Sequence, residues 1–252
     1  VPFVWMFATS LREPVESFTL PPKWIPTEFV IENYVRATTL MPFLKFFWNS
    51  FKISATVTLG QLITCSMGAF AFARLQFRGK DLLFIILLSS LMIPSQVTII
   101  PIFILVRKLG LANTHSSIIL PSLISIFGVF LLRQFFLTIP KELEEAAIID
   151  GADTFTIYSR IILPLAGPGL STLAILCFNY HWNEFFRPLI FLNSYEKMTL
   201  PLGLVMIQGY FATTSVSVIM AGVSLSLIPV LLAFLLAQRY LIEGITLTGL
   251  KG

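Results

Sequence analysis

Charged residues are scarce in this chain, in which aspartate, glutamate, lysine and arginine together make up 12% of 252 residues. Soluble domains carry about twice that share. Hydrophobic residues account for 56% of the chain, and phenylalanine alone occupies 24 positions. A composition so poor in charge and so rich in apolar side chains excludes an ordinary water-soluble domain and predicts a membrane protein.

Residues that bind metals or form disulfides are also rare. The two cysteines, Cys65 and Cys177, each lie inside an apolar run, where they behave as small hydrophobic side chains. The two histidines, His115 and His181, stand alone, so neither a metal site nor a disulfide framework is expected. The net charge of +4 says little about nucleic acid in a membrane protein, and no nucleic-acid partner is expected.

Motifs of nucleotide binding and hydrolysis are missing. Gly79-Lys80 lacks both the earlier glycine and the following hydroxyl residue of a phosphate-binding loop, so the chain is not expected to bind ATP. No zinc-protease motif and no serine–histidine arrangement occurs, which argues against an enzyme. The long apolar runs contain no charged residue, although ion-coupled secondary transporters usually need one. Because unwound backbone can also bind sodium, a secondary transporter stays open as an alternative.

Long apolar runs dominate what is present. A helix needs about 20 apolar residues to span the hydrocarbon core of a bilayer. Five uncharged runs reach that length and predict an all-α polytopic membrane protein, with kinks expected at Pro94 and Pro101. Gly60, Thr64 and Gly68 form a small-residue stripe that predicts close helix packing. The runs are 53–73, 82–106, 109–132, 161–183 and 216–238.

The residues before the first long run divide into two parts. Residues 1–9 are apolar but too short to span, and we interpret them as the end of a first membrane helix that is largely missing from the chain. Residues 10–52 are rich in proline and mixed in polarity, which predicts an extracytoplasmic loop with short helical pieces. Residues 53–252 then form the transmembrane domain.

One polar segment, residues 139–164, interrupts the apolar sequence. Glu142, Glu144 and Glu145 suit the start of a helix, where the helix dipole favours negative charge. Gly151 is expected to end that helix with a positive φ, and Asp153 to cap a second short helix. From the residues alone, the segment is either an amphipathic loop between membrane helices or a helix–turn–helix paddle for another protein. In the second case Ala146 and Ala147 provide a small patch for close approach, and Pro164 closes the unit.

The spacing within this segment carries a family resemblance. Glu145-Ala146-Ala147, three residues, Gly151, nine residues, Ile161, one residue and Leu163-Pro164 resemble the EAA motif of permease subunits in binding-protein-dependent ABC importers. The resemblance implies that the paddle is a cytoplasmic coupling loop that docks on a separate ATPase subunit. The residues expected to serve this coupling are Glu145, Ala146, Ala147, Asp150, Gly151, Ile161, Leu163 and Pro164.

A second resemblance concerns the class of solute. Trp182-Asn183-Glu184, Pro188-Leu189 and the segment 199–203 resemble the sugar-transporting branch, specifically the second permease subunit of maltose-type importers. Tyr180, Trp182, Asn183 and Glu184 are therefore candidates for a substrate path or a contact with the binding protein. The alternative is an ordinary aromatic belt at the membrane boundary. Permeases for non-sugar solutes share the EAA loop and also remain possible.

What the resemblance implies for the whole assembly can be stated as expectations. The fold would be the six-helix core of a type I ABC importer permease in a bacterial or archaeal inner membrane. Its partners would be a homologous second permease, two cytoplasmic ATPase subunits that hold ATP and Mg²⁺, an extracytoplasmic sugar-binding protein and a sugar or oligosaccharide. Lysine and arginine divide almost equally between the two predicted sides, so the orientation depends on the resemblance.

Overall fold

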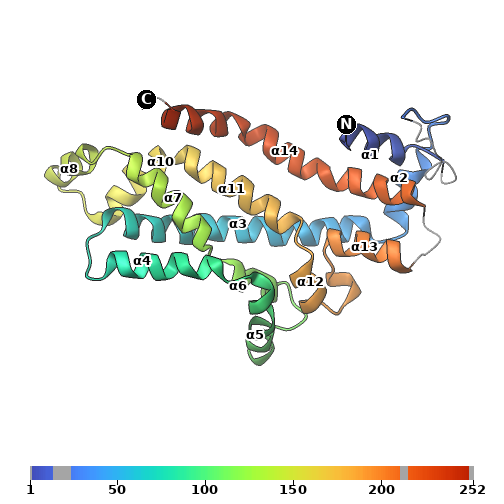
Figure 1. Cartoon of the computed structure of the whole chain (residues 1–252), viewed down its shortest axis with the longest axis horizontal. Coiled ribbons are helices and arrows are strands. Elements are labelled where there is room, and N and C mark those ends of the chain that lie inside the picture. The colour runs from blue at the N-terminus through green and yellow to red at the C-terminus, as the bar shows by residue number, and fades with distance from the viewer. Residues whose placement is uncertain (1, 14–23, 211–214, 250–252) are drawn as a thin grey trace.

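The computed structural model describes residues 2–13, 24–210 and 215–249, and these parts are helical without a strand. The side chains of residues 208–210 and 236–249 are outside this description. Figure 1 shows the long helix α3 running through the molecule, with α7, α11 and α14 packed alongside it or one another. The helices of this bundle are α1 (Pro2–Ser10), α2 (Glu32–Thr39), α3 (Phe43–Arg74), α4 (Lys80–Ser89), α7 (Ile126–Thr138), α11 (Gly167–Trp182) and α14 (Val216–Gly249).

Shorter elements link the bundle helices. Between α4 and α7 lie the 3₁₀ turn η2 (Ser90–Met92), α5 (Ser95–Lys108) and α6 (Ser116–Ser122). Between α7 and α11 lie α8 (Glu142–Ile149), α9 (Thr154–Thr156), the π-helical stretch η3 (Ile157–Ile162) and α10 (Leu163–Leu165). After α11 come α12 (Phe186–Phe191), η4 (Tyr195–Lys197) and α13 (Leu200–Tyr210).

The predicted number of membrane-spanning segments agrees with the structure. Three helices are long and apolar enough to cross a membrane, and two bent pairs of helices bring the number to five if each pair counts as one span. These segments coincide in order with the five apolar runs. They are Phe43–Arg74, Lys80–Met92 with Ser95–Lys108, Ser116–Thr138, Thr154–Leu165 with Gly167–Trp182, and Val216–Leu235.

The second run is sharply bent, and a kink was predicted at the residue where it bends. The chain bends by 100° between Lys80–Met92 and Ser95–Lys108, so that α5 leaves the bundle at a steep angle (Figure 1). Pro94 sits at this break with an extended ψ, as expected for a residue that cannot donate a helical hydrogen bond. Pro101 lies inside α5 without ending it. Only one of the two predicted proline kinks therefore breaks the helix.

The helix α3 begins at Phe43, ten residues before the apolar run that predicted it, so part of the predicted loop 10–52 is helical. Polar side chains of this extension anchor the loop around η4. The amide of Asn49 donates to the backbone oxygens of Glu196 and Met198, at 3.0 and 2.9 Å, and the Ser50 hydroxyl accepts from the Leu200 N–H. Hydropathy finds the apolar part of a helix and misses such a polar extension. Residues 1 and 14–23 of the predicted N-terminal segments lie outside the described residues.

Side chains of α3 compensate the break between α6 and α7. Gln61 donates to the Ser122 oxygen, Thr64 to the Leu123 oxygen and the Cys65 thiol to the Ser125 oxygen. Backbone carbonyls freed in an apolar environment need such partners. A Cβ at Gly60 would lie 2.4 Å from the Leu123 side chain, so the glycine permits this approach. The small-residue stripe on α3 is thus a packing surface, as predicted.

Candidate functional site

The polar segment 139–164 forms a helical paddle at one end of the molecule, and α1, α2 and α13 lie toward the opposite end (Figure 1). Its first helix, α8, carries Glu142, Glu144 and Glu145 in its first turn, as predicted. The paddle projects beyond the bundle, yet it contains apolar side chains. Ile149 is 86% exposed and Phe155 is 69% exposed. An apolar surface left open on a projecting element is typical of a protein-docking site.

The two faces of α8 differ in what they contact. Residues three and four apart share a helix face, and one such face points into the molecule through Glu144 and Ala147. Ala147 packs against the chain's own hydrophobic core, so only Ala146 of the predicted alanine patch stays open to a partner. The outward face carries Glu142, Glu145, Ala146 and Ile149, all exposed. Glu145 forms no salt bridge within the described residues.

A Schellman motif ends α8. The Ala152 N–H donates to the Ala147 oxygen at 2.9 Å, and the Gly151 N–H donates to the Ile148 oxygen at 3.0 Å. This pair of bonds requires a left-handed residue after the helix. Gly151 supplies it with φ +83°, which confirms the predicted positive φ. A Cβ there would meet nothing within 4 Å, so glycine is needed for its backbone freedom and not for space.

The second half of the paddle starts at the predicted Asp153 cap, but it ends later in the chain than the predicted Pro164. The Asp153 carboxylate accepts from the Thr156 N–H at 2.8 Å, capping α9. Hydrogen bonds from the Thr156 hydroxyl and N–H lower the pKa of this exposed carboxyl. The prediction that Pro164 closes the unit is wrong, because helix continues through α10 and the 75° bend follows at Ala166.

The remaining predicted coupling residues divide between the core and the surface. Ile161 packs against the same hydrophobic core as Ala147, and Leu163 is half-buried. Asp150 and Pro164 are exposed. Tyr158, between them in sequence, donates or accepts a 2.8 Å hydrogen bond with the Ser66 hydroxyl of α3, which holds η3 against the bundle.

Arg74 at the end of α3 joins the paddle to the bundle, a role that the sequence analysis missed. Its guanidinium donates to the backbone oxygens of Phe136 and Ile139, both at 2.6 Å, at the end of α7. It also forms an ion pair of 2.8 Å with Glu144. The side chains are 3% and 15% exposed, so this is a buried charge pair. Movement of α8 is thereby linked directly to α3 and α7.

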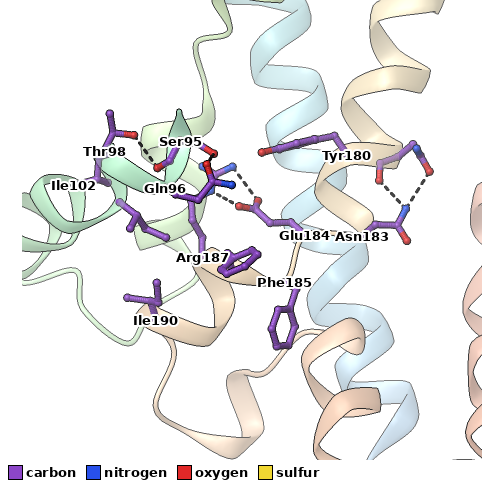
Figure 2. A pocket seen from close by; sticks show the side chains of 13 residues that line it. Ser95, Gln96, Thr98, Ile102, Tyr180, Asn183, Glu184, Phe185, Arg187 and Ile190 are labelled. Carbon is purple, nitrogen blue, oxygen red and sulfur yellow. Dashed lines mark hydrogen bonds and ion pairs between the residues drawn. The ribbon is translucent and has the colours of Figure 1, made fainter. Parts of the chain in front are cut away.

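A cavity of about 840 Å³ lies between α5, the end of α11 and α12. Its size falls within the usual range for small-molecule sites, roughly 300–1,000 Å³. Figure 2 shows the Tyr180 ring extending from α11 toward α5, with Glu184 and Arg187 below it and Gln96 on the α5 side. The lining residues are Ser95, Gln96, Thr98, Ile99, Ile102, Asn179, Tyr180, Asn183, Glu184, Phe185, Phe186, Arg187 and Ile190.

Glu184 and Arg187 form a two-point ion pair in this cavity. The Arg187 Nε and Nη2 groups donate to the two carboxylate oxygens, and Nη1 donates to the Ser122 hydroxyl. His181 Nδ1 lies 3.2 Å from the same carboxylate. Burial alone would raise the pKa of Glu184, but the hydrogen bond with His181 and the charge and hydrogen bonds of Arg187 lower it. Glu184 follows the membrane-spanning segment that ends at Trp182.

Three of the four predicted path residues line this cavity. Tyr180 is 58% exposed, Asn183 is exposed and Glu184 is half-buried. The prediction of Trp182 as a path residue is wrong, because its side chain is buried, with 1% exposed, and lines no part of the cavity. It packs between Phe47 and Phe178, and its indole N–H donates to the Ser226 oxygen. Successive residues of a helix point about 100° apart around its axis. Trp182 can therefore face the core while Tyr180 and Asn183 face the cavity.

A second cavity, of about 580 Å³, adjoins the first and shares Asn179, Tyr180 and Arg187 with it. Its floor contains Gln61 and Ser122, which also belong to the hydrogen-bond network around Arg187. Arg187 was not among the predicted site residues. Its spacing of three residues from Glu184 was a usable signal, since such pairs approach each other across a helical turn. No group of metal-ligating residues occurs in the described parts of the chain.

Comparison with known proteins places this geometry in a family. The model of the binding-protein-dependent transport system inner membrane component matches residues 30–246. The chain is 36% identical to the arabinooligosaccharides transport system permease protein AraQ of Halalkalibacterium halodurans, over 90% of this chain and 81% of AraQ. It is 32% identical to the trehalose/maltose transport system permease protein MalG of Thermococcus litoralis, over 100% of this chain and 91% of MalG.

A solved structure agrees with these sequence relatives. A chain of a bacterial ABC transporter that imports the acidic polysaccharide alginate superposes with a TM-score of 0.81, at 25% identity. The match covers 95% of this chain and 90% of that chain. The chain therefore belongs to the family of inner membrane components of binding-protein-dependent transport systems, as a permease subunit of an ABC importer.

Proposed function

We propose that this chain forms one half of the translocation pathway of an ATP-driven carbohydrate importer. It would pair with a homologous permease and be driven by two cytoplasmic ATPase subunits, which hold ATP and Mg²⁺. The observation that carries the coupling role is the outward face of α8, where Glu145, Ala146 and Ile149 are exposed while Glu144 ties the helix to α3. That face suits docking by a second protein, and the tie suits transmission of its movement.

The mechanism requires the ATPase to distinguish two states of the permease. A partner that binds the inward-open and outward-open states equally shifts no population, and reversing a 1:99 ratio needs about 5.5 kcal/mol of differential binding. Arg74 provides a physical route for that difference, because it ends α3 and contacts both the end of α7 and Glu144 of α8. A shift of α8 therefore breaks or moves buried contacts of α3 and α7.

Carbohydrate is the proposed solute for two reasons. The names of AraQ and MalG state oligosaccharide and disaccharide transport for those proteins. The cavity beside α11 combines amide and hydroxyl side chains with aromatic rings, as sites for sugars require. The matching solved structure belongs to an importer of an acidic polysaccharide.

Purification of the tagged chain in mild detergent, with identification of every co-purifying subunit, tests this function. We expect an ATPase and one homologous permease, with ATP hydrolysis that rises when binding protein and sugar are added. A folded chain that purifies without an ATPase would contradict the coupling role. Hydrolysis that rises only with an amino acid or another non-sugar solute would contradict the proposed solute class.

A further inference from the structure

We infer that the cavity between α5, α11 and α12 binds an uncharged carbohydrate, and that the Glu184–Arg187 pair makes it select against acidic sugars. This inference rests on the proposed function and specifies its solute. It starts from the charges of the cavity wall. Of the lining residues, only Glu184 and Arg187 are charged, and they have opposite sign.

These two charged side chains already bind each other. Arg187 contacts both oxygens of the Glu184 carboxylate, the arrangement in which a guanidinium binds a carboxylate most strongly. Its third contact is to the Ser122 hydroxyl. A sugar carboxylate entering the cavity would have to displace Glu184 from Arg187, which would leave the protein's own carboxylate half-buried without its partner. An acidic sugar therefore finds no free positive charge in the cavity, and contact with Arg187 would cost it the Glu184–Arg187 pair.

The uncharged polar groups of the wall are available to a ligand. Among the described residues, the Gln96 amide nitrogen, the Asn183 side-chain oxygen and the Tyr180 hydroxyl have no hydrogen-bond partner. They comprise a donor, an acceptor and a group that does both. Sugar hydroxyls also donate and accept, so they match this set. The Asn183 oxygen is held in place because its amide nitrogen donates to Asn179 at 2.8 and 3.0 Å.

Aromatic and apolar surface completes the site. Tyr180, Phe185 and Phe186 come from the end of α11 and the start of α12, and Ile99 and Ile102 come from α5. The Tyr180 ring reaches over the polar groups in Figure 2. An aromatic ring presents an apolar face to the C–H side of a sugar, whereas the amides meet its hydroxyls. A mostly apolar wall with a few placed polar groups is the usual form of a small-molecule site.

Binding to the purified permease–ATPase complex, without binding protein, tests the inference by calorimetry. The neutral probes are maltotriose, arabinotriose and diacetylchitobiose, and the acidic probe is an alginate trisaccharide. We expect at least one neutral probe to bind about tenfold or more tightly than the acidic one. Contact with Arg187 would cost the acidic probe at least one charged hydrogen bond between Arg187 and Glu184, and such a loss weakens binding by about this factor. Equal or tighter binding of the alginate trisaccharide would overturn the inference, as would the failure of every neutral probe.

Variants locate the site. Tyr180→Ala and Asn183→Ala should each weaken the neutral probe about tenfold, and the control Tyr195→Ala, an exposed tyrosine outside this cavity, should not. Glu184→Gln leaves Arg187 without its carboxylate and should raise the relative binding of the acidic probe. If that variant fails to fold, Glu184→Gln/Arg187→Gln removes both charges and should reduce the preference for the neutral probe over the acidic one.

Transport measured with the complete importer distinguishes a failure of the cavity assignment from a failure of the proposed importer function. Carbohydrate uptake that the Tyr180 and Asn183 variants leave unchanged would overturn the cavity assignment and leave the importer role intact. Intact ATP hydrolysis without uptake of any neutral or acidic carbohydrate would instead contradict the proposed function.

Discussion

The paddle and the cavity are the two polar regions described above, and they differ in whether their charged side chains are exposed or paired with each other. On the outward face of α8, Glu142 and Glu145 are exposed beside Ile149. In the cavity, Glu184 and Arg187 neutralise each other. Exposed charge next to exposed apolar surface suits a protein partner with complementary groups. Charges cancelled within the wall leave only neutral groups for a small ligand.

The largest effect is expected where the paddle meets the bundle. Glu144→Met leaves Arg74 buried without its carboxylate, and breaking a buried ion pair by removing one partner costs roughly 3–5 kcal/mol. We expect a clear fall in the thermal unfolding temperature of the complex in detergent. Glu142→Met, on the exposed face of the same helical turn, is the control and should change it little. An equal change of the unfolding temperature in the two variants would show that the Arg74–Glu144 ion pair does not stabilise the permease.

The next effect concerns the turn that orients α8. Gly151→Asp forces a side chain into the left-handed region, at a cost of about 1–3 kcal/mol for such backbone strain. We expect the subunit to insert in the membrane but to uncouple transport from ATP hydrolysis, measured as sugar uptake per ATP. Gly110→Asp is the control, because Gly110 also has a positive φ with open space around it and lies away from the paddle. Normal coupled uptake by Gly151→Asp would contradict the role of the turn.

These two sites show what the sequence could and could not predict. The apolar runs and the glycine after α8 are local signals, and they predicted the five spans and the positive φ of Gly151. The Arg74–Glu144 pair joins residues far apart in the chain, so no local pattern indicates it. Trp182 was a candidate for the path because Trp182-Asn183-Glu184 resemble the sugar-transporting branch, but helical geometry turns it into the core. The sequence pattern identified the right segment of the chain, but it could not tell which way the Trp182 side chain points.

A smaller effect is expected for the apolar part of the docking face. Ile149→Ser removes a side chain that is 86% exposed, so it should not destabilise the permease itself. It should weaken binding of the ATPase by about 1–2 kcal/mol if Ile149 is an anchor of the interface. Leu137→Ser, an exposed leucine of α7, is the control. Retention of the ATPase during purification at increasing dilution measures the difference, and identical retention would remove Ile149 from the interface.

The smallest effect concerns the cap of α9. Asp153 has a lowered pKa in the folded chain, so its cap stabilises the paddle above the carboxyl's ordinary pKa of 3.8 and loses that effect as the pH falls through the lower folded value. Asp153→Ala should speed hydrogen exchange of the Thr156 amide at neutral pH. Asp153→Asn should keep most of the protection, because asparagine also caps helices. Equal exchange in all three proteins would mean that the cap does not hold the paddle.

The comparison between paddle and cavity depends most directly on what touches the outward face of α8. A photo-crosslinking amino acid at position 149 in the assembled transporter measures this, with the same group at Tyr195, an exposed position on η4, as the reference. We predict that position 149 captures the ATPase subunit and that position 195 does not. Capture of the ATPase at position 195 alone, or of no subunit at position 149 in an active transporter, would contradict the coupling role of the paddle.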